Sequence, residues 1–260
     1  MSDTHTVKVE SKDGVAVVSI HRPDKRNALD AEMHAHLARA FDALRGDAAV
    51  RVVVLTGAGK AFVSGADVRE FVGQSPVTVH QALRGAPSAI DAAAGFPKPL
   101  IAMINGYCLG SGNELALACD IRIASEDARF GQPEINLGMI PGYGATQRLP
   151  RLTGLGKALW IMYTGAILDS SEAFRLGLVD QVVPAKQLRD RTMTLAKVIA
   201  TKSPVALALI KEAARSSMRA PLDDGVRHEQ SLASLIFSSK DVQEGLAAFL
   251  EKRQPRFTGE

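Results

Sequence analysis

The 260-residue chain is poor in cysteine, in unbalanced charge and in long apolar runs, and each shortage argues against a class of protein. Its two cysteines, Cys108 and Cys119, both lie in apolar segments, which favours buried thiols over a disulfide or a metal pair. A net charge of +3, carried by scattered basic residues, does not favour binding to nucleic acid. No run is long enough to span a membrane, and residues 1–10 lack the basic-then-apolar pattern of a secretion signal. We therefore expect a cytoplasmic globular protein with neither a membrane nor a nucleic-acid partner.

Nucleotide and metal motifs are missing as well. No GxGxxG pattern falls between a predicted strand and a predicted helix, which argues against a nicotinamide or flavin fold. In GAGKAF, residues 57–62, Ala61 stands where a phosphate-binding loop needs serine or threonine. The six histidines show no ligand spacing. We expect no metal and no cofactor.

The hydrophobic pattern predicts an α/β protein. Strands and helices alternate over about the first 150 residues, and about 100 residues of helical pattern follow. The predicted strands are 6–10, 15–21, 50–55 and 99–104, and the predicted helices are 31–45, 76–94, one from near Ser111, 145–149, 157–163, 171–176, 188–201, 204–216, 222–235 and 242–252.

The stretch 105–134 carries the candidate chemistry. Its glycines let the backbone approach a ligand closely, and a helix is predicted to start near Ser111. Glu114 falls in the first turn of that helix, and Glu134 follows Pro133. The Ser111 amide at the helix start, with the Ala66 amide as a second donor, would stabilise an oxyanion. Two carboxylates beside an enolate would then move protons around it.

The residues alone leave a structural interpretation open. A glutamate in the first turn of a helix is favoured by the helix dipole, and one after Gln-Pro is often at the surface. A serine nucleophile has less support, because Ser111 is not in a GxSxG motif and no histidine is near it in the sequence. His34 and His36 are expected to lie on the solvated side of helix 31–45.

Five segments together resemble the crotonase superfamily of enoyl-CoA hydratases and isomerases over nearly the whole chain. They are HRPDKRNALD, GAGKAFVSGAD, NGYCLGSGNELALACDIRIAS, ARFGQPEINLGMIPGYGATQRL and AFLEKRQPRF. The resemblance implies a spiral of strand-strand-helix turns over residues 1–200 and a helical region, 201–260, that forms trimers or dimers of trimers. It also implies an acyl-coenzyme A substrate.

The resemblance assigns roles to individual residues. It makes the backbone amides of Ala66 and Ser111 the oxyanion hole, with Ser111 standing where glycine is usual. It makes Glu114 the main activator of water and Glu134 the main proton donor to Cα, the two acting jointly, with the Gly142 backbone holding the water. The residues it places at the coenzyme A or acyl group are Lys25, Arg26, Ala28, Ser64, Asp67, Tyr143, Lys252 and Phe257.

Tyr143 departs from the family pattern, since a smaller residue is often found there. Its ring either shortens the acyl pocket, which would suggest short substrates, or points outward. The predicted activity is syn hydration of a trans-2-enoyl-CoA to a 3-hydroxyacyl-CoA. The alternatives are double-bond isomerisation, hydration of a branched, cyclic or dicarboxylic acyl group, or a non-catalytic or RNA-binding relative.

Overall fold

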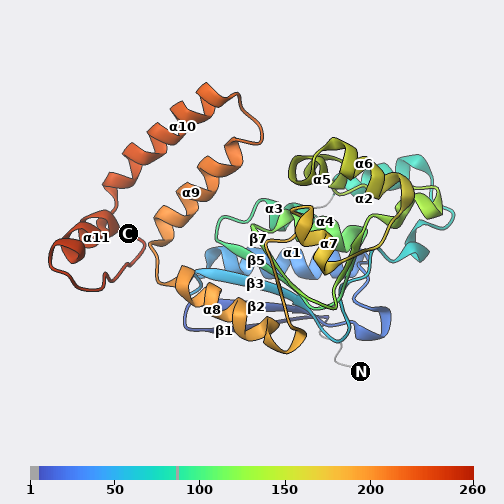
Figure 1. Ribbon diagram of the computed structural model, residues 1–260, viewed down its shortest axis with the longest axis horizontal. Helices are drawn as coiled ribbons and strands as arrows, with labels where there is room; N and C mark the ends of the chain where they lie inside the picture. Colours follow the sequence, from blue (N-terminus) through green and yellow to red (C-terminus); the bar gives the residue numbers. More distant parts are fainter. Residues whose placement is uncertain (1–5, 86–87) are drawn as a thin grey trace.

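The computed structural model describes residues 6–85 and 88–260, and its strands form two sheets (Figure 1). The strands are β1 (Val7–Lys12), β2 (Val15–Ile20), β3 (Val52–Gly57), β4 (Ala61–Val63), β5 (Leu100–Ile104), β6 (Tyr107–Leu109), β7 (Ile121–Ser125), β8 (Arg129–Gly131), β9 (Leu168–Asp169) and β10 (Gln181–Val183). The larger sheet has the order β1-β2-β3-β5-β7-β10 and the smaller β4-β6-β8-β9. Neighbouring strands are parallel except in the β1–β2 and β8–β9 pairs.

Helices follow the strands and cover the sheets. The α-helices are α1 (Ala31–Gly46), α2 (Pro76–Gly85), α3 (Ala89–Ala94), α4 (Ser111–Ala118), α5 (Ala145–Thr153), α6 (Leu155–Thr164), α7 (Ser170–Arg175), α8 (Leu188–Ala200), α9 (Pro204–Ser216), α10 (Leu222–Leu235) and α11 (Lys240–Leu250). Short 3-10 helices are η1 (Pro23–Lys25), η2 (Val68–Phe71), η3 (Pro133–Leu137), η4 (Ala185–Gln187) and η5 (Ile236–Ser238).

The chain passes from the larger sheet to the smaller one and back in repeated turns. β3 leads to β4, β5 to β6 and β7 to β8, and helices follow each pair. This arrangement confirms the predicted spiral of strand-strand-helix turns. The turns pack closely: a side-chain carbon on Gly112 of α4 would lie 2.2 Å from the Val63 carbonyl oxygen of β4, so this position needs glycine.

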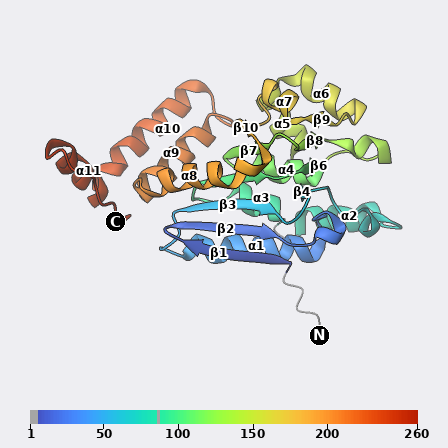
Figure 2. The same cartoon turned by 60° about the horizontal axis from the view of Figure 1, so that its bottom comes forward.

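The larger sheet is buried on both faces, as its apolar strands require. On one face α1 packs Met33, Leu37, Phe41 and Leu44, the residues whose spacing predicted the helix. On the other face α8 packs against alternate residues of β2 and β3. Figure 2 shows α1 and α8 on opposite sides of the sheet.

Two expectations about secondary structure were wrong. The region after residue 150 is not purely helical, because β9 extends the smaller sheet and β10 the larger one. Strands of two or three residues are too short to show a period, and pairing with a buried neighbour specifies them instead. The predicted helix 76–94 is two helices, and the side chain of Ser88 accepts the Asp91 amide at the start of α3. Residues 86 and 87 lie outside the described part.

The helices α9, α10 and α11 extend away from the sheets at one end of the molecule (Figure 1). No single helix in the described ranges is long and apolar enough to cross a membrane. The segments 185–200 and 204–216 meet that criterion only as a pair, by length and composition, and are bent by 106°. The division at residue 201 and the role of the last helices in oligomerisation stay predictions.

Candidate active site

The two predicted oxyanion amides lie on loops that the fold brings together. A parallel bridge joins Leu29 to Ala66, so the Gly65 carbonyl and the Asp67 amide bond to Leu29. A side-chain carbon on Gly110 would lie 3.7 Å from Gly65 Cα, so the two loops are in contact. Within residues 6–85 and 88–260, neither the Ala66 amide nor the Ser111 amide donates to another residue. Both therefore remain available to an acceptor on a ligand.

Glu114 is the most buried carboxylate of the site. It lies in the first turn of α4 and is 1% exposed. Its Oε1 accepts the backbone amides of Tyr143 at 2.8 Å and Ala145 at 2.9 Å. Burial raises the pKa of Glu114 to about 7, although these two hydrogen bonds lower it. A group with such a pKa exchanges protons readily at neutral pH.

Glu134 approaches from the 3-10 helix η3. A side-chain carbon on Gly110 would lie 3.2 Å from Glu134 Oε1, which places the carboxylate beside the start of α4. Its Oε2 is buried and has no hydrogen-bond partner in the described ranges. Burial raises the pKa of Glu134, and its charge in turn raises the pKa of Glu114. The two glutamates therefore interact electrostatically across one site.

The turn before α5 supports Glu114. Arg148 Nη1 donates to the Tyr143 carbonyl at 2.8 Å and so fixes the turn whose amides hold the carboxylate. Sequence reasoning missed Arg148, because its contact is made to the backbone and leaves no motif. Gly142, the predicted water-positioning residue, lies in the same turn and is exposed.

Tyr143 points inward. Its ring centroid lies 5.1 Å from that of His34 on α1, and both rings line a cavity of about 660 Å³ that also reaches Ala66. His34 Nδ1 accepts the Ala89 amide at 3.2 Å. Burial lowers the pKa of His34, so the ring is neutral at pH 7. The expectation that His34 is a solvated residue was wrong.

The predicted coenzyme A residues of the first loop lie beside Ala66. Lys25 and Arg26 are exposed on and just after η1, and the Arg26 guanidinium lies 5.5 Å from the ring centre of Tyr107. The Ser64 amide donates to the Arg26 carbonyl at 3.1 Å, and Ala28 precedes the residue bridged to Ala66. Exposed cations at this edge suit phosphate groups.

Asp67 is placed differently from the other predicted contacts. It is buried, and Arg69 Nε donates to its Oδ1 at 2.7 Å while Arg22 lies 3.5 Å from its Oδ2. The hydrogen bond from Arg69 lowers the pKa of Asp67 to about 2. Asp67 therefore holds the loop through arginines and caps η2.

Asn27 is a further residue that the sequence did not single out. It is fully buried and donates to the carbonyls of Ala58 and Ala61 while accepting the Arg22 amide. It thus ties the turn after η1 to the loop between β3 and β4. Its φ of 58° is one that asparagine tolerates better than most residues.

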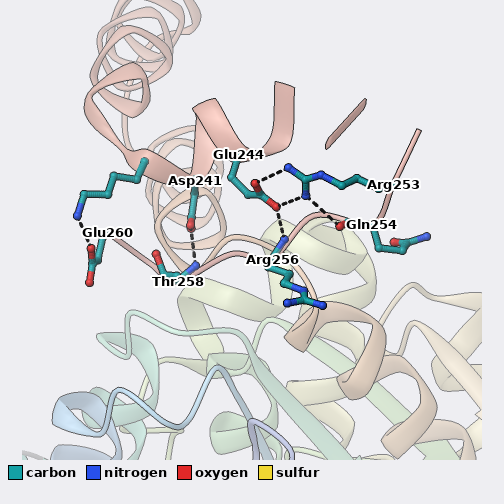
Figure 3. Close-up of a pocket in the computed structure, with 8 residues that line it drawn as sticks. Asp241, Glu244, Arg253, Gln254, Arg256, Thr258 and Glu260 are labelled. Atoms are coloured by element: carbon teal, nitrogen blue, oxygen red, sulfur yellow. Dashed lines mark hydrogen bonds and ion pairs between the residues drawn. The ribbon is translucent and has the colours of Figure 1, made fainter. Parts of the chain in front are cut away.

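Lys252 and Phe257 belong to the tail after α11. The helix α11 lies at the opposite end of the molecule from α2 (Figures 1 and 2). Phe257 packs against Gly245 of α11. Figure 3 shows that charged residues of this tail pair with those of α11, as in the Glu244–Arg253 ion pair at 2.6 Å. Within one chain, neither predicted contact is brought to the two glutamates.

The described residues hold no cluster of three or more histidine, cysteine, aspartate or glutamate side chains suited to a metal ion. Cys108 and Cys119 are buried free thiols, as predicted. The expected independence from metals and cofactors stays a prediction.

Two sheets linked by strand-strand-helix turns, with paired glutamates at one helix start, define the class: this is the crotonase fold. The sequence model of the enoyl-CoA hydratase/isomerase family matches residues 10–260. The chain belongs to that family, as its motifs predicted.

Named relatives cover nearly all of the chain. It is 39% identical to the crotonyl-CoA hydratase of Syntrophomonas wolfei over 96% of each chain. It is 38% identical to the short-chain-enoyl-CoA hydratase of Clostridium acetobutylicum over 97% of each chain. The crystal structure of an enoyl-CoA hydratase from Bacillus anthracis is 39% identical and superposes with a TM-score of 0.94, over 98% of this chain and 100% of that one.

Proposed function

We propose that this protein is an enoyl-CoA hydratase that adds water syn across a trans-2-enoyl-CoA to give a 3-hydroxyacyl-CoA. The observation that carries the proposal is the placement of Glu114 and Glu134 beside two amides that have no partner in the described ranges. The names of the full-length relatives agree with it.

In this proposal the amides of Ala66 and Ser111 hold the thioester oxygen. Glu114 Oε1 is already occupied by the Tyr143 and Ala145 amides, which leaves Oε2 to take a proton from water. The hydroxide adds to Cβ, and negative charge develops on the thioester oxygen, where two fixed donors stabilise it. Glu134 gives a proton to Cα, a role that the raising of its pKa by burial supports.

Lys25 and Arg26 would bind phosphates of coenzyme A, with Ala28 and Ser64 beside them. Lys252 and Phe257 would contribute only from a neighbouring subunit, which fits the predicted trimer or dimer of trimers. No cofactor is required, because the enolate is stabilised by backbone amides alone. The cytoplasmic location also stays a prediction.

The test is loss of absorbance of the conjugated thioester, followed with wild type and Glu134→Gln on trans-2-enoyl-CoA. Wild type should hydrate the substrate, and the variant should lose about 10²-fold or more in kcat while keeping its fold by circular dichroism. Glu32→Gln, at an exposed position of α1, is the matched control. Conversion of a 3-enoyl-CoA without hydration of the 2-enoyl isomer would favour an isomerase, and no turnover with salt-dependent RNA binding would overturn the proposal.

A further inference from the structure

The cavity beside Tyr143 is much larger than a four-carbon acyl group requires. Its volume of about 660 Å³ lies within the range of pockets that enclose drug-sized ligands. Ala66, one of the two amide donors, and Tyr143, whose amide holds Glu114, both line it. The cavity therefore begins where the reacting carbons of an acyl thioester would lie.

One wall of the cavity is a face of α1 made largely of alanine. Ala31, Ala35 and Ala38 line it, followed by Arg39 and Asp42. Alanine leaves space that larger side chains would fill. Asp42 lies eleven residues after Ala31, so the wall is about 16 Å long at the rise of an α-helix. An extended chain advances about 1.2 Å per bond, so the wall matches about a dozen bonds.

The facing wall, from η2 and α2, is largely apolar. Phe71, Val79, Ala82 and Leu83 line it, together with the polar side chains of Gln74 and Thr78. An acyl chain between these walls is removed from water on both of its sides. Each methylene group buried in this way raises the affinity by about fourfold at most.

The charged groups at the cavity do not oppose an apolar chain. Glu70 is engaged, because both its carboxylate oxygens accept the Ala31 amide, at 3.1 and 3.2 Å. Arg39 and Asp42 are exposed at the far end of the α1 wall. His34 is neutral at pH 7 and packs against Tyr143, with the two rings tilted by 33°. The charged side chains at the cavity are therefore either exposed at the far end of the α1 wall, as are Arg39 and Asp42, or held by a backbone amide, as is Glu70.

We infer that this chain acts on enoyl-CoA esters whose acyl group extends well beyond four carbons and runs between α1 and α2 towards Arg39. The inference rests on the proposed hydratase function. It differs from the expectation that Tyr143 shortens the pocket, because the ring forms part of the cavity wall and leaves the space along α1 open. It also distinguishes this chain from relatives named for crotonyl-CoA and short-chain substrates.

The experiment compares trans-2-enoyl-CoA substrates of four, eight and ten carbons. We expect KM of wild type to fall at least tenfold from four to eight carbons. Ala38→Leu narrows the cavity, and should lower kcat/KM for the ten-carbon substrate at least tenfold more than it lowers the value for the four-carbon substrate. Ala43→Leu makes the same change at an exposed position of α1 outside the cavity, and should alter neither value.

Binding of saturated decanoyl-CoA, measured by calorimetry, supplies a readout independent of turnover. Its affinity should exceed that of butyryl-CoA in wild type and fall towards it in Ala38→Leu. Equal or weaker kcat/KM for eight and ten carbons than for four, or equal effects of the two leucine substitutions, would overturn the inference. Hydration of the four-carbon substrate alone would leave the proposed function intact, whereas failure with every substrate would remove both.

Discussion

Two glutamates, one in the core and one in α11, accept backbone amides and yet titrate in opposite directions. Glu114 in the core accepts the amides of Tyr143 and Ala145, and burial raises its pKa to about 7. Glu244 in α11 accepts hydrogen bonds from the Arg256 amide and the Arg253 guanidinium. The hydrogen bond from Arg253 lowers its pKa to about 2.

The two pKa values shift in opposite directions because the carboxylates differ in their charged partners and in their exposure to solvent. Glu244 has an arginine partner and a side chain 26% exposed, so its charged form is stabilised. Glu114 has two dipoles but no ion pair, and desolvation outweighs them. Amide hydrogen bonds therefore orient a buried carboxylate without fixing its charge, which is what a group that moves protons requires.

The largest expected effect is on the rate of hydration, which should depend on Glu114 and not on Glu244. Glu114→Gln removes the proton acceptor while keeping an oxygen for the two amides, so hydration should fall by about 10²- to 10⁴-fold. Glu244→Gln, the same change in α11, should leave hydration unchanged. Thioester absorbance gives both rates, and the kcat/KM of wild type should decrease as the pH falls through about 7, where Glu114 becomes protonated.

Near-normal turnover of Glu114→Gln would contradict the role of Glu114 in hydration. An equal loss in Glu114→Gln and Glu244→Gln would contradict it as well. A wild-type profile flat between pH 6 and 8 would show that Glu114 does not act as the base.

A smaller effect is expected from the turn that supplies the two amides. Gly144 has a φ of 108°, and a side-chain carbon there would lie 2.3 Å from Arg148 Nη1. Gly144→Ala therefore strains the backbone and displaces the arginine that holds the Tyr143 carbonyl. Hydration should fall about tenfold, with the acid limb of the pH profile displaced, since the amides help to set the pKa of Glu114.

Gly154→Ala is the matched control at the other end of α5. Gly154 also has a positive φ, of 83°, but no neighbouring atom lies within 4 Å of the added carbon. It should lower the melting temperature without moving the pH profile. The same displacement in both variants would mean that the turn does not tune Glu114.

The sequence predicted those parts of the fold that have a period or a motif. α1 appeared through four apolar residues at helical spacing, and β3 through a continuous apolar run. The short strands β9 and β10 could not be predicted, because three residues carry no period and only pairing with a buried strand specifies them.

The residues of the site likewise divide into those that the sequence predicted and those that it did not. Glu114 and Glu134 were singled out in the stretch 105–134, the resemblance to a family assigned their roles, and the structure brings them to one helix start. Arg148 was missed because it donates to a carbonyl, and the pairing of Asp67 with Arg69 was missed because it is local side-chain geometry. The inward direction of Tyr143 depends on His34, 109 positions earlier in the chain, and no local pattern encodes such a contact.

The smallest expected effect is on stability, and its sign differs between the two glutamates. The pKa of Glu114 is raised above its unfolded value, so the folded state is favoured at low pH and that advantage is lost as the pH rises through about 7. The free energy of unfolding of Glu114→Gln should therefore rise by about 2 kcal/mol relative to that of wild type between pH 5 and 8.

The pKa of Glu244 is lowered to about 2, so its contribution to stability is present above the unfolded pKa and is lost as the pH falls towards 2. Glu244→Gln should be slightly less stable than wild type at pH 7, less so in high salt, and equal to it near pH 2. Denaturant unfolding at each pH measures both differences, and stability curves that run parallel for the two variants would contradict the opposite titration of the two carboxylates.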